Sequence, residues 1–304
     1  MLDGFDFGVG ILHRVVAKTD DERRLVIASI GPVWDGNEVW LLAAGGTTLL
    51  VFPGVVAAGF SGLYLPVIFA VWALMVRGAS IELRSHLGSP LWRSFFDMSF
   101  FVSSLVVPIL MGAALGNVLR GVPLDARGFF ELPLFASWSP TGELGVLDWY
   151  TVLCGLFVTA TLAAHGANWL VLKTGGEVQA RAVTVRRPLL LATGVLWLLT
   201  AVATFVVAPP STHSFWWLGV VVSLAGATAT VLKKSERAAF LGSSAFIVGQ
   251  LLTAFGGLFP VLLRARENPQ FSLTAASAAS QGAGRNFALV WWVLRHFRGK
   301  AQLD

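Results

Sequence analysis

Long apolar stretches alternate with short polar breaks along the whole chain. A helix needs about 20 apolar residues to cross the hydrocarbon core of a bilayer, and most of these stretches are of that order. Alternating segments of about ten residues, typical of a membrane β-barrel, are absent. We therefore predict an all-α, polytopic transmembrane helical bundle of about nine helices, forming one integral membrane domain over residues 1–304. The predicted segments are 2–12, 25–52, 54–76, 97–119, 146–172, 188–208, 215–232, 238–263 and 286–297.

The first and last predicted segments, 2–12 and 286–297, are shortened. At about 1.5 Å per residue each reaches roughly 17–18 Å, well below the ~30 Å of the hydrocarbon core. We expect a first helix that has lost its N-terminal half through a misplaced start. The alternative is a helix that is short by nature and thins the bilayer around it.

The composition also indicates a membrane protein. Hydrophobic residues make up 55% of the chain and charged residues 13%, with a mean hydropathy of +0.71. A soluble domain carries about 25% charged residues, so a soluble enzyme is excluded. The single cysteine, Cys154, excludes a disulfide or a CxxC metal cluster within the chain. The net charge of +5 does not indicate nucleic-acid binding, because Lys and Arg of membrane proteins gather in cytoplasmic loops.

The basic residues predict the orientation of the bundle. When assigned to alternating loops, 17 of the 22 Lys and Arg residues fall on one side and 5 on the other. The richer side is expected to be cytoplasmic, which places the N-terminus outside and the C-terminus in the cytoplasm. The poorer set is Arg120, Arg127, Arg264, Arg266 and Arg285.

The most informative polar residues lie in the second predicted segment. Asp35 stands about ten residues past the start of its apolar run, which predicts a position near the middle of the bilayer. Glu38 follows at i+3 on the same helical face, and Pro32 can kink the helix one turn earlier. A carboxylate at this depth costs about 2.5–3.5 kcal/mol, so it is a candidate functional group. We predict a buried proton relay; the alternative is a pair that only hydrogen-bonds a neighbouring helix.

Other polar residues extend or flank this stretch. Asp3 and Asp6 stand at i+3 among glycines of the first segment and could continue the polar path; otherwise they form a solvated helix end. Arg77 and Arg84 lie at the end of the third segment, where interfacial anchoring is the simpler interpretation. Asp97 opens the fourth segment and would favour its N-terminal dipole.

Aromatic and histidine residues give weaker signals. Trp34 and Trp40 flank the carboxylates, where an indole could stack on a quinone ring or fill a helix interface. His165 is the one histidine well within a predicted segment, and it is expected to bond across helices. Because no histidine pair has ligand spacing, we predict neither a bis-histidine haem nor a metal site in this chain.

Several strings resemble subunit II of the cytochrome bd family of quinol oxidases, in order from residue 3 to about 280. The long GPVWDGNEVWL string inside an apolar segment is the most specific of them. Whether the chain falls in the true bd branch or the cyanide-insensitive branch stays open. The matching strings cover residues 3–10, 21–24, 31–41, 58–64, 116–123 and 268–274.

The resemblance implies a nine-helix subunit that is inactive alone and pairs with a haem-bearing subunit I. That partner would carry two haems b and one haem d, or haem b in its place. The complex would sit in the bacterial or archaeal cell (inner) membrane, oxidise quinol, reduce dioxygen to water and take up protons from the cytoplasm. The resemblance leaves open a small accessory subunit and a structural quinone. Membrane lipid, but no nucleic acid, is expected as a further partner.

Carried over position by position, the resemblance gives roles to single residues. It assigns Asp35 to a carboxylate on the proton path, Asp6 to another acidic position of that path, and Arg77 to an arginine near it. Trp34 matches a position beside the structural quinone of some members. No catalytic residue is expected in this subunit. The alternatives are a proton-coupled secondary transporter, for which paired broken helices are not evident, and an inactive truncated family member.

Overall fold

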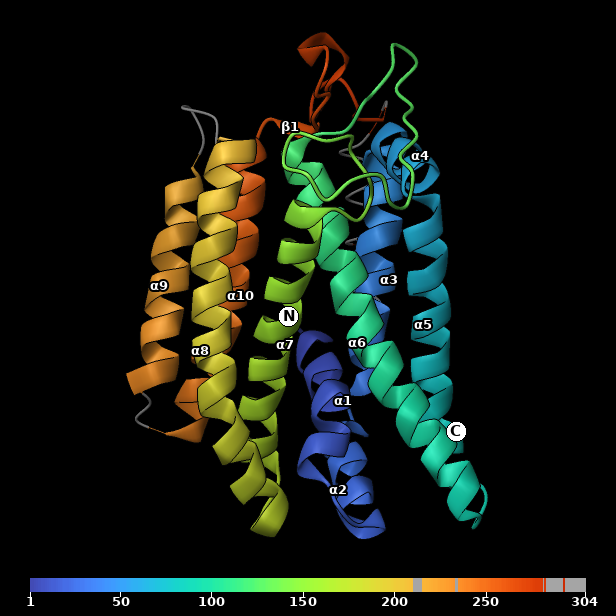
Figure 1. The fold of residues 1–304 in the computed structure, drawn as a ribbon, viewed down its shortest axis with the longest axis vertical. Helices are drawn as coiled ribbons and strands as arrows, with labels where there is room; N and C mark the ends of the chain where they lie inside the picture. Colours follow the sequence, from blue (N-terminus) through green and yellow to red (C-terminus); the bar gives the residue numbers. More distant parts are fainter. Residues whose placement is uncertain (210–214, 233–234, 281, 283–291, 293–304) are drawn as a thin grey trace.

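Ten helices make up most of the computed structural model, which describes residues 1–209, 215–232, 235–280, 282 and 292. The long helices stand side by side in one bundle, and two short strands and a long loop cover one end of it (Figure 1). The helices are α1 (Gly4–Val16), α2 (Asp20–Ile30), α3 (Trp34–Val51), α4 (Pro53–Gly62), α5 (Tyr64–Leu83), α6 (Pro90–Arg120), α7 (Trp149–Lys173), α8 (Gly176–Val207), α9 (Trp216–Leu232) and α10 (Glu236–Leu258).

Local sequence signals set where several helices begin. Thr19 caps α2 in a reciprocal box with Glu22, and Asp148 caps α7 in a similar box with Thr151. Proline opens α4 and α6, where its missing N–H is not needed. The helical bundle expected from the sequence is therefore confirmed, and its elements begin at recognisable residues.

Five of the described helices are long and apolar enough to cross a membrane: α5, α6, α7, α8 and α10. The pair α3 and α4 passes the same test as one broken span, bent by 117°. With α9, a shorter apolar helix, and the 13-residue α1, these helices account for the first eight predicted segments. The ninth, 286–297, lies outside the described residues apart from Trp292.

Two predicted segments are wrong as continuous helices. The 25–52 segment is interrupted at residues 31–33, because Pro32 supplies no backbone donor there. Its first part belongs to α2, which starts five residues earlier with the charged run Asp20-Asp21-Glu22-Arg23-Arg24. The 54–76 segment divides at Leu63 into α4 and α5. The extra breaks explain why the described chain has ten helices.

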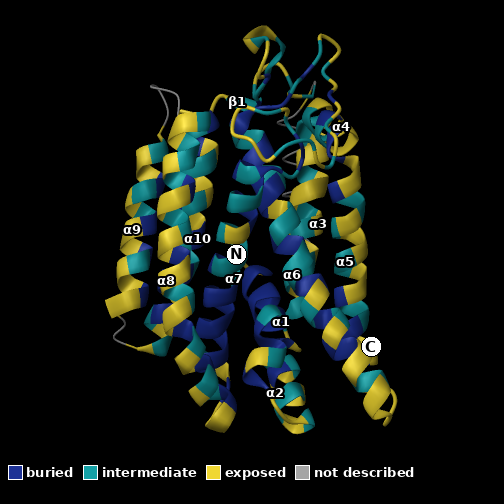
Figure 2. Ribbon diagram, in the orientation of Figure 1, coloured by how far each residue is buried: buried dark blue, intermediate teal, exposed yellow. Residues whose placement is uncertain are grey.

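Helix α1 forms the centre of the core. It lies between α6 and α7, and its residues are almost all buried (Figure 2). Close approach requires glycine here: a Cβ on Gly8 would lie 2.0 Å from the Leu162 carbonyl oxygen, and one on Gly10 would lie 2.0 Å from Ser104 Oγ. The glycines of the first segment therefore do bring neighbouring helices together, as the sequence predicted.

A second, smaller core lies at the opposite end of the bundle from α2. Strand β1 (Val261–Leu263) pairs antiparallel with β2 (Leu273–Thr274), and the one-turn helix η1 (Pro269–Phe271) joins them. Side chains of α4, the 121–148 loop and β1 pack there in one apolar cluster. Arg120 at the end of α6 forms a buried ion pair with Asp148 at the start of α7.

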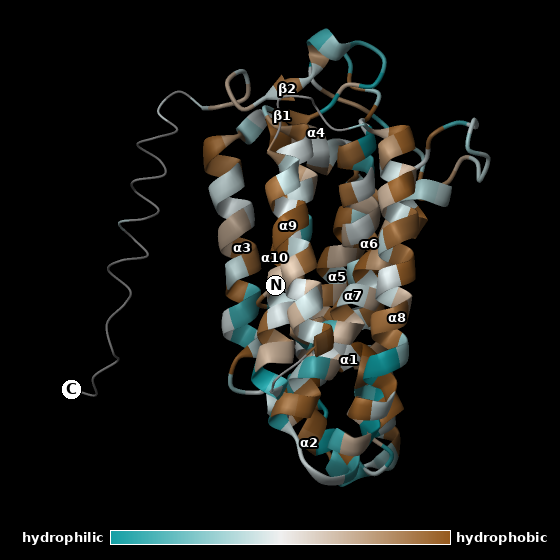
Figure 3. Cartoon of the chain, turned by 90° about the vertical axis from the view of Figure 1, so that its left-hand side faces the viewer, coloured by the Kyte–Doolittle hydropathy of each residue, from teal (hydrophilic) through white to brown (hydrophobic). Residues whose placement is uncertain are grey.

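The described basic residues separate by end. Members of the richer set lie around α2 and the helix ends beside it, where hydrophilic residues are concentrated (Figure 3). The described members of the poorer set, Arg120, Arg127, Arg264 and Arg266, lie at the end that carries β1. The asymmetry that predicts the orientation is therefore a property of the folded bundle.

Candidate functional site

A polar stripe runs along one face of α1. Asp3, Asp6, Gly10 and His13 follow one another at intervals of three, four and three residues, which places them on the same side of a helix. Asp6 and His13 are fully buried and Asp3 is 8% exposed. A buried polar face is costly in a bilayer unless its groups are paired, so the partners of each residue are informative.

Arg77 of α5 holds the first part of the stripe. Its Nη2 atom donates to Asp3 Oδ1 at 2.6 Å and to Glu38 Oε2 of α3 at 3.3 Å, and its guanidinium lies 4.1 Å from the centre of the Phe7 ring. Arg77 is completely buried, so its interpretation as an interfacial anchor is wrong. One cation thus joins carboxylates of α1 and α3 inside the bundle.

Asp6 is tied to α3 through a different bond. The Asn37 amide donates to Asp6 Oδ2 at 2.7 Å. Within the described residues no donor reaches Asp6 Oδ1 or Asp3 Oδ2, and the two carboxyl groups are close enough for one to hydrogen-bond the other. A single shared proton would satisfy both oxygens, as in other closely spaced carboxyl pairs.

Asp35 is placed differently from the prediction. It lies in the first turn of α3, immediately after the 31–33 break, rather than in the middle of a continuous helix. Its side chain is exposed, whereas Glu38 one turn later is 20% exposed and bound to Arg77. The two carboxylates still lie on one face of α3, and Asp35 is the exposed member of the pair.

A second ion-pair cluster closes the other end of the stripe. His13 Nε2 bonds Asp97 Oδ1 at 2.7 Å, and Arg84 and Arg23 donate to the same carboxylate at 2.6 and 3.0 Å. Because α6 begins at Pro90, Asp97 lies inside the helix and is 1% exposed. Its interpretation as a helix-opening residue is therefore wrong.

Asp20 links that cluster to the surface. It accepts from Arg84 at 2.8 Å and from Arg93 at 2.9 Å. Burial favours a higher pKa for Asp20, but the bond from Arg84 and the charges of Arg84, Arg93 and Arg24 outweigh it, so its pKa lies below the usual value. The sequence did not suggest this cluster, because its members come from separate polar breaks.

Ser104 of α6 lies between the two clusters. It is fully buried beside Gly10, and its hydroxyl has no partner among the described residues; His13 Nδ1 and two nitrogens of Arg77 share this property. Buried polar atoms in proteins are usually paired with protein or with ordered water. The stripe therefore has the polarity needed to hold water between Asp6 and His13, about 10 Å apart along α1.

The aromatic and histidine candidates lie outside this stripe. Trp34 packs against the core around α1, 3.6 Å from a Cβ placed on Gly78, while Trp40 is 55% exposed. His165 Nδ1 bonds Ser243 Oγ of α10 at 2.8 Å, as expected of a histidine that bonds across helices. Its ring stacks on Phe240 with 4.8 Å between centroids, which leaves no room for a macrocycle at that face.

Each of the two buried histidines of the described chain is bonded to another side chain. His13 is bound to Asp97 and His165 to Ser243. No group of three or more His, Cys, Asp or Glu side chains in the described chain could hold a metal ion. Chemically, the arrangement offers closely spaced carboxyl groups, one buried guanidinium and unpartnered buried polar atoms, which are suited to a proton path.

Comparison with known proteins gives a consistent result. A sequence model of cytochrome bd terminal oxidase subunit II matches residues 1–296. The cytochrome bd-I ubiquinol oxidase subunit 2 of Escherichia coli K12 is 30% identical over 96% of this chain and 84% of its own length. The cytochrome bd ubiquinol oxidase subunit 2 of Bacillus subtilis is 30% identical over 92% and 81%. A chain of the bd oxidase from Geobacillus thermodenitrificans shares the fold, with a TM-score of 0.68, 20% identity and coverage of 98% and 93%.

Proposed function

This chain belongs to the cytochrome bd terminal oxidase subunit II family, and from that premise we propose that it is the haem-free subunit of a quinol oxidase. It is a multi-pass membrane protein of an oxidoreductase complex. The relatives are named as ubiquinol oxidase subunits, which supports quinol as the electron donor and dioxygen as the acceptor. Membership of this family gives no support to the transporter alternative.

Haem belongs to the complex and, in our proposal, to the haem-bearing subunit I. Bound there, haem b and haem d, or haem b alone, supply the chemistry that reduces dioxygen to water. The residues of this chain would support the partner and deliver protons.

The proposed proton path follows the polar stripe. A proton enters at Asp35 from the end of the bundle rich in basic residues, passes to Glu38 on the same face of α3, and reaches the Asp3–Asp6 pair of α1. Arg77 would hold Asp3 and Glu38 in place and balance part of their charge. The observation that carries this proposal is the buried carboxyl pair of Asp3 and Asp6, whose facing oxygens lack any donor in the described chain.

Substitution of Asp6 by Asn in the assembled complex tests the path. We expect Asp6→Asn and Asp35→Asn to slow quinol-dependent oxygen uptake strongly, because an amide keeps the shape of the carboxyl group but cannot carry its proton. The reduced-minus-oxidised haem spectrum should stay unchanged, since these residues do not contact haem in our proposal. Asp21→Asn is the matched control, because Asp21 is an exposed carboxylate on α2.

Two results would contradict the proposal at different levels. Wild-type oxygen uptake in both Asp6→Asn and Asp35→Asn would reject the proton path and leave the polar stripe a packing feature. A purified complex without haem signals or a second multi-span chain would reject the subunit assignment, and would favour an inactive family member.

The remaining partner sites stay proposals. Trp34 is the better placed of the two quinone candidates, because it is half-buried against the core whereas Trp40 is exposed. Quinone extracted from the complex and lost in Trp34→Leu, but retained in Trp40→Leu, would support this assignment. A small accessory subunit and the surrounding lipid complete the proposed set of partners.

A further inference from the structure

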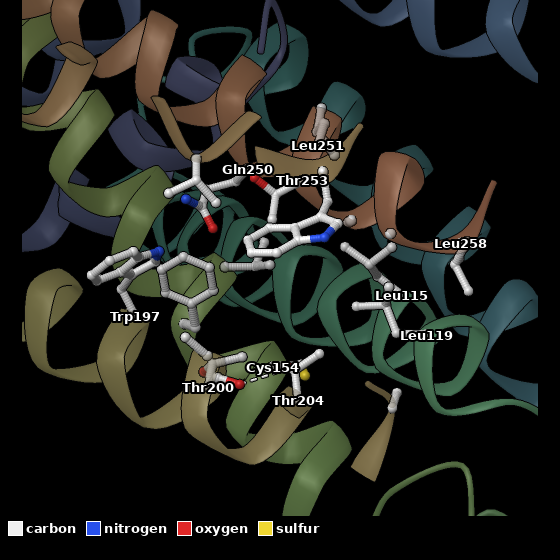
Figure 4. A pocket seen from close by; sticks show the side chains of 18 of the residues that line it. Leu115, Leu119, Cys154, Trp197, Thr200, Thr204, Gln250, Leu251, Thr253 and Leu258 are labelled. Carbon is white, nitrogen blue, oxygen red and sulfur yellow. Dashed lines mark hydrogen bonds between the residues drawn. The ribbon is translucent and has the colours of Figure 1, made fainter. Parts of the chain in front are cut away.

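A cavity of about 500 Å³ lies in the half of the bundle that the polar stripe does not reach (Figure 4). Side chains of α6, α7, α8, α9 and α10 line it, and they are almost all apolar. Its volume falls within the range of pockets that bind small molecules, about 300–1,000 Å³. An apolar space of this size among membrane helices is large enough to hold a small apolar molecule or part of one.

The cavity arises from the way the helices pair. Helices α8 and α10 both pack on α7, and α9 packs closely on α10 through glycines such as Gly226. Between α8 and the α9–α10 pair, Arg186 bonds Glu236 at one end, and Phe205 lies against Trp216 with ring centroids 5.8 Å apart at the other. The lining residues Phe205 and Leu251 are 54% and 40% exposed, so the cavity opens sideways.

The length of the cavity matches one leaflet of a bilayer. Along α8 its lining runs from Trp197 to Ala208, and along α10 from Ile247 to Leu258. Both stretches cover about 16 Å at 1.5 Å per residue, against about 15 Å for half of the hydrocarbon core. The cavity thus extends from the β1 end of the bundle to roughly mid-membrane.

The polar residues of the lining are mostly engaged with the protein. The Gln250 amide donates to Ser223 Oγ at 2.8 Å, and the Thr204 hydroxyl bonds Tyr150 at 2.9 Å. Among the lining threonines only Thr200 lacks a partner in the described chain. The inner end of the cavity therefore favours a hydrocarbon chain over a polar head.

The outer end carries a charge. Arg264 directly follows β1 and lines the cavity. Its side chain forms no hydrogen bond or ion pair with the described residues. Its partly exposed guanidinium has the donors that bind a phosphate oxygen. An unpaired cation at the mouth of an apolar space one leaflet long is complementary to an anionic phospholipid.

We propose that this cavity binds one acyl chain of an anionic phospholipid, with the headgroup phosphate on Arg264. The lipid would fill the gap between α8 and the α9–α10 pair and so hold this half of the bundle together. The inference is independent of the proton path and goes beyond the proposed function, because it concerns a ligand of the opposite half of the chain.

Quantification of phospholipid retained by the purified oxidase complex tests the site. The complex is delipidated in detergent, incubated with phosphatidylglycerol or phosphatidylcholine, and examined by native mass spectrometry. We expect Arg264→Gln to weaken phosphatidylglycerol binding roughly fivefold, about 1 kcal/mol, which is the usual contribution of one basic residue near an anionic headgroup. Phosphatidylcholine binding should change less. Arg266→Gln is the matched control, because Arg266 is exposed and does not line the cavity.

A cavity-filling variant tests the acyl-chain part separately. Ala201→Phe places a ring in the cavity from α8, whereas Val202→Phe adds the same ring at a neighbouring position that is 57% exposed and outside the lining. We expect Ala201→Phe to lose the retained lipid and Val202→Phe to keep it. Equal retention in the two variants, or equal phosphatidylglycerol binding in Arg264→Gln and Arg266→Gln, would overturn the proposal. Specific retention of a neutral isoprenoid molecule in place of phospholipid would overturn it as well.

Discussion

Arg120 and Asp148 illustrate how single buried charges are held in this bundle. The ion pair is almost inaccessible to solvent, with side-chain exposures of 3% for both residues. Arg120 also donates to Asn117 Oδ1 at 2.6 Å, and Asp148 accepts from the backbone N–H groups of Tyr150 and Thr151. Each charge therefore has several partners, which offsets the cost of removing it from water.

Removal of Asp148 should be strongly destabilising. Asp148→Ala leaves the Arg120 charge buried and unpaired, which costs about 3–5 kcal/mol, and it also deletes the cap of α7. Thermal unfolding of the detergent-solubilised complex should show a clearly lower midpoint. Asp125→Ala is the control, because the Asp125–Arg127 pair is exposed and worth at most about 1 kcal/mol. Equal midpoints for the two variants would refute the argument.

Glu22 should make the docking of α2 sensitive to acid. Bonds from the Lys18 and Thr19 backbone N–H groups, followed by the Arg181 guanidinium, lower the pKa of Glu22 below its usual value. A carboxylate with a lowered folded-state pKa stabilises the fold above its unfolded pKa of about 4.3, and this stability is lost as the pH falls through the lower value. The protection of the α2 amides, corrected for the intrinsic pH dependence of hydrogen exchange, should therefore be constant from pH 7 to 5 and fall below that range. Glu22→Gln should weaken the pH dependence but not abolish it, because the pKa of Asp20 is lowered too.

Helix α1 shows which features of an element follow from its own sequence. Its glycines predict close packing, and Gly8 does approach the backbone of α7. The sequence indicated a kink at Pro32 but not a full break of the helix there. It also placed the start of the segment too late, because the charged residues 20–24 that begin α2 read as a polar break. Hydropathy located α7 and α9 to within three residues at each end, because their apolar runs are bounded by clear polar breaks.

A substitution pair tests the packing of α1. Gly8→Ala forces a methyl group against the Leu162 carbonyl oxygen and should destabilise the complex by about 1–3 kcal/mol. Gly45→Ala in α3 meets nothing within 4 Å and should be neutral or stabilising by up to about 1 kcal/mol, because alanine favours a helix. The two thermal midpoints should shift in opposite directions. A neutral Gly8→Ala would show that α1 can move away from α7.

The candidate site was only partly predictable for a related reason. Asp3, Asp6 and Glu38 could be singled out because a carboxylate in an apolar segment is exceptional in any context. The bond between His13 and Asp97 joins residues 84 positions apart, and no local pattern specifies such a pair. Asp35 was predicted inside a continuous helix because its distance from the start of the apolar run was counted through the 31–33 break, whereas it lies in the first turn of α3.

At the scale of the molecule, the two halves of the bundle have different tasks in our proposals. The polar stripe and the buried arginines gather around α1, α3 and the end of α5, whereas the parts of α8 to α10 that line the apolar cavity carry no charged residue. A proton path needs paired charges and water, whereas an acyl chain needs an apolar lining. One chain can supply both because α7 separates the two regions.

The orientation of the whole bundle decides from which side protons enter, and it can be tested with introduced cysteines. Cys154 is buried, so new surface thiols can be distinguished from it. Lys18 and Arg127 are exposed residues at opposite ends of the bundle. Since the end with α2 holds most of the basic residues, we expect it to face the cytoplasm. A membrane-impermeant maleimide should then label Arg127→Cys in intact cells or spheroplasts, and Lys18→Cys only after permeabilisation. The reverse pattern would place the α2 end of the bundle outside, and proton uptake from the cytoplasm could then not begin at that end.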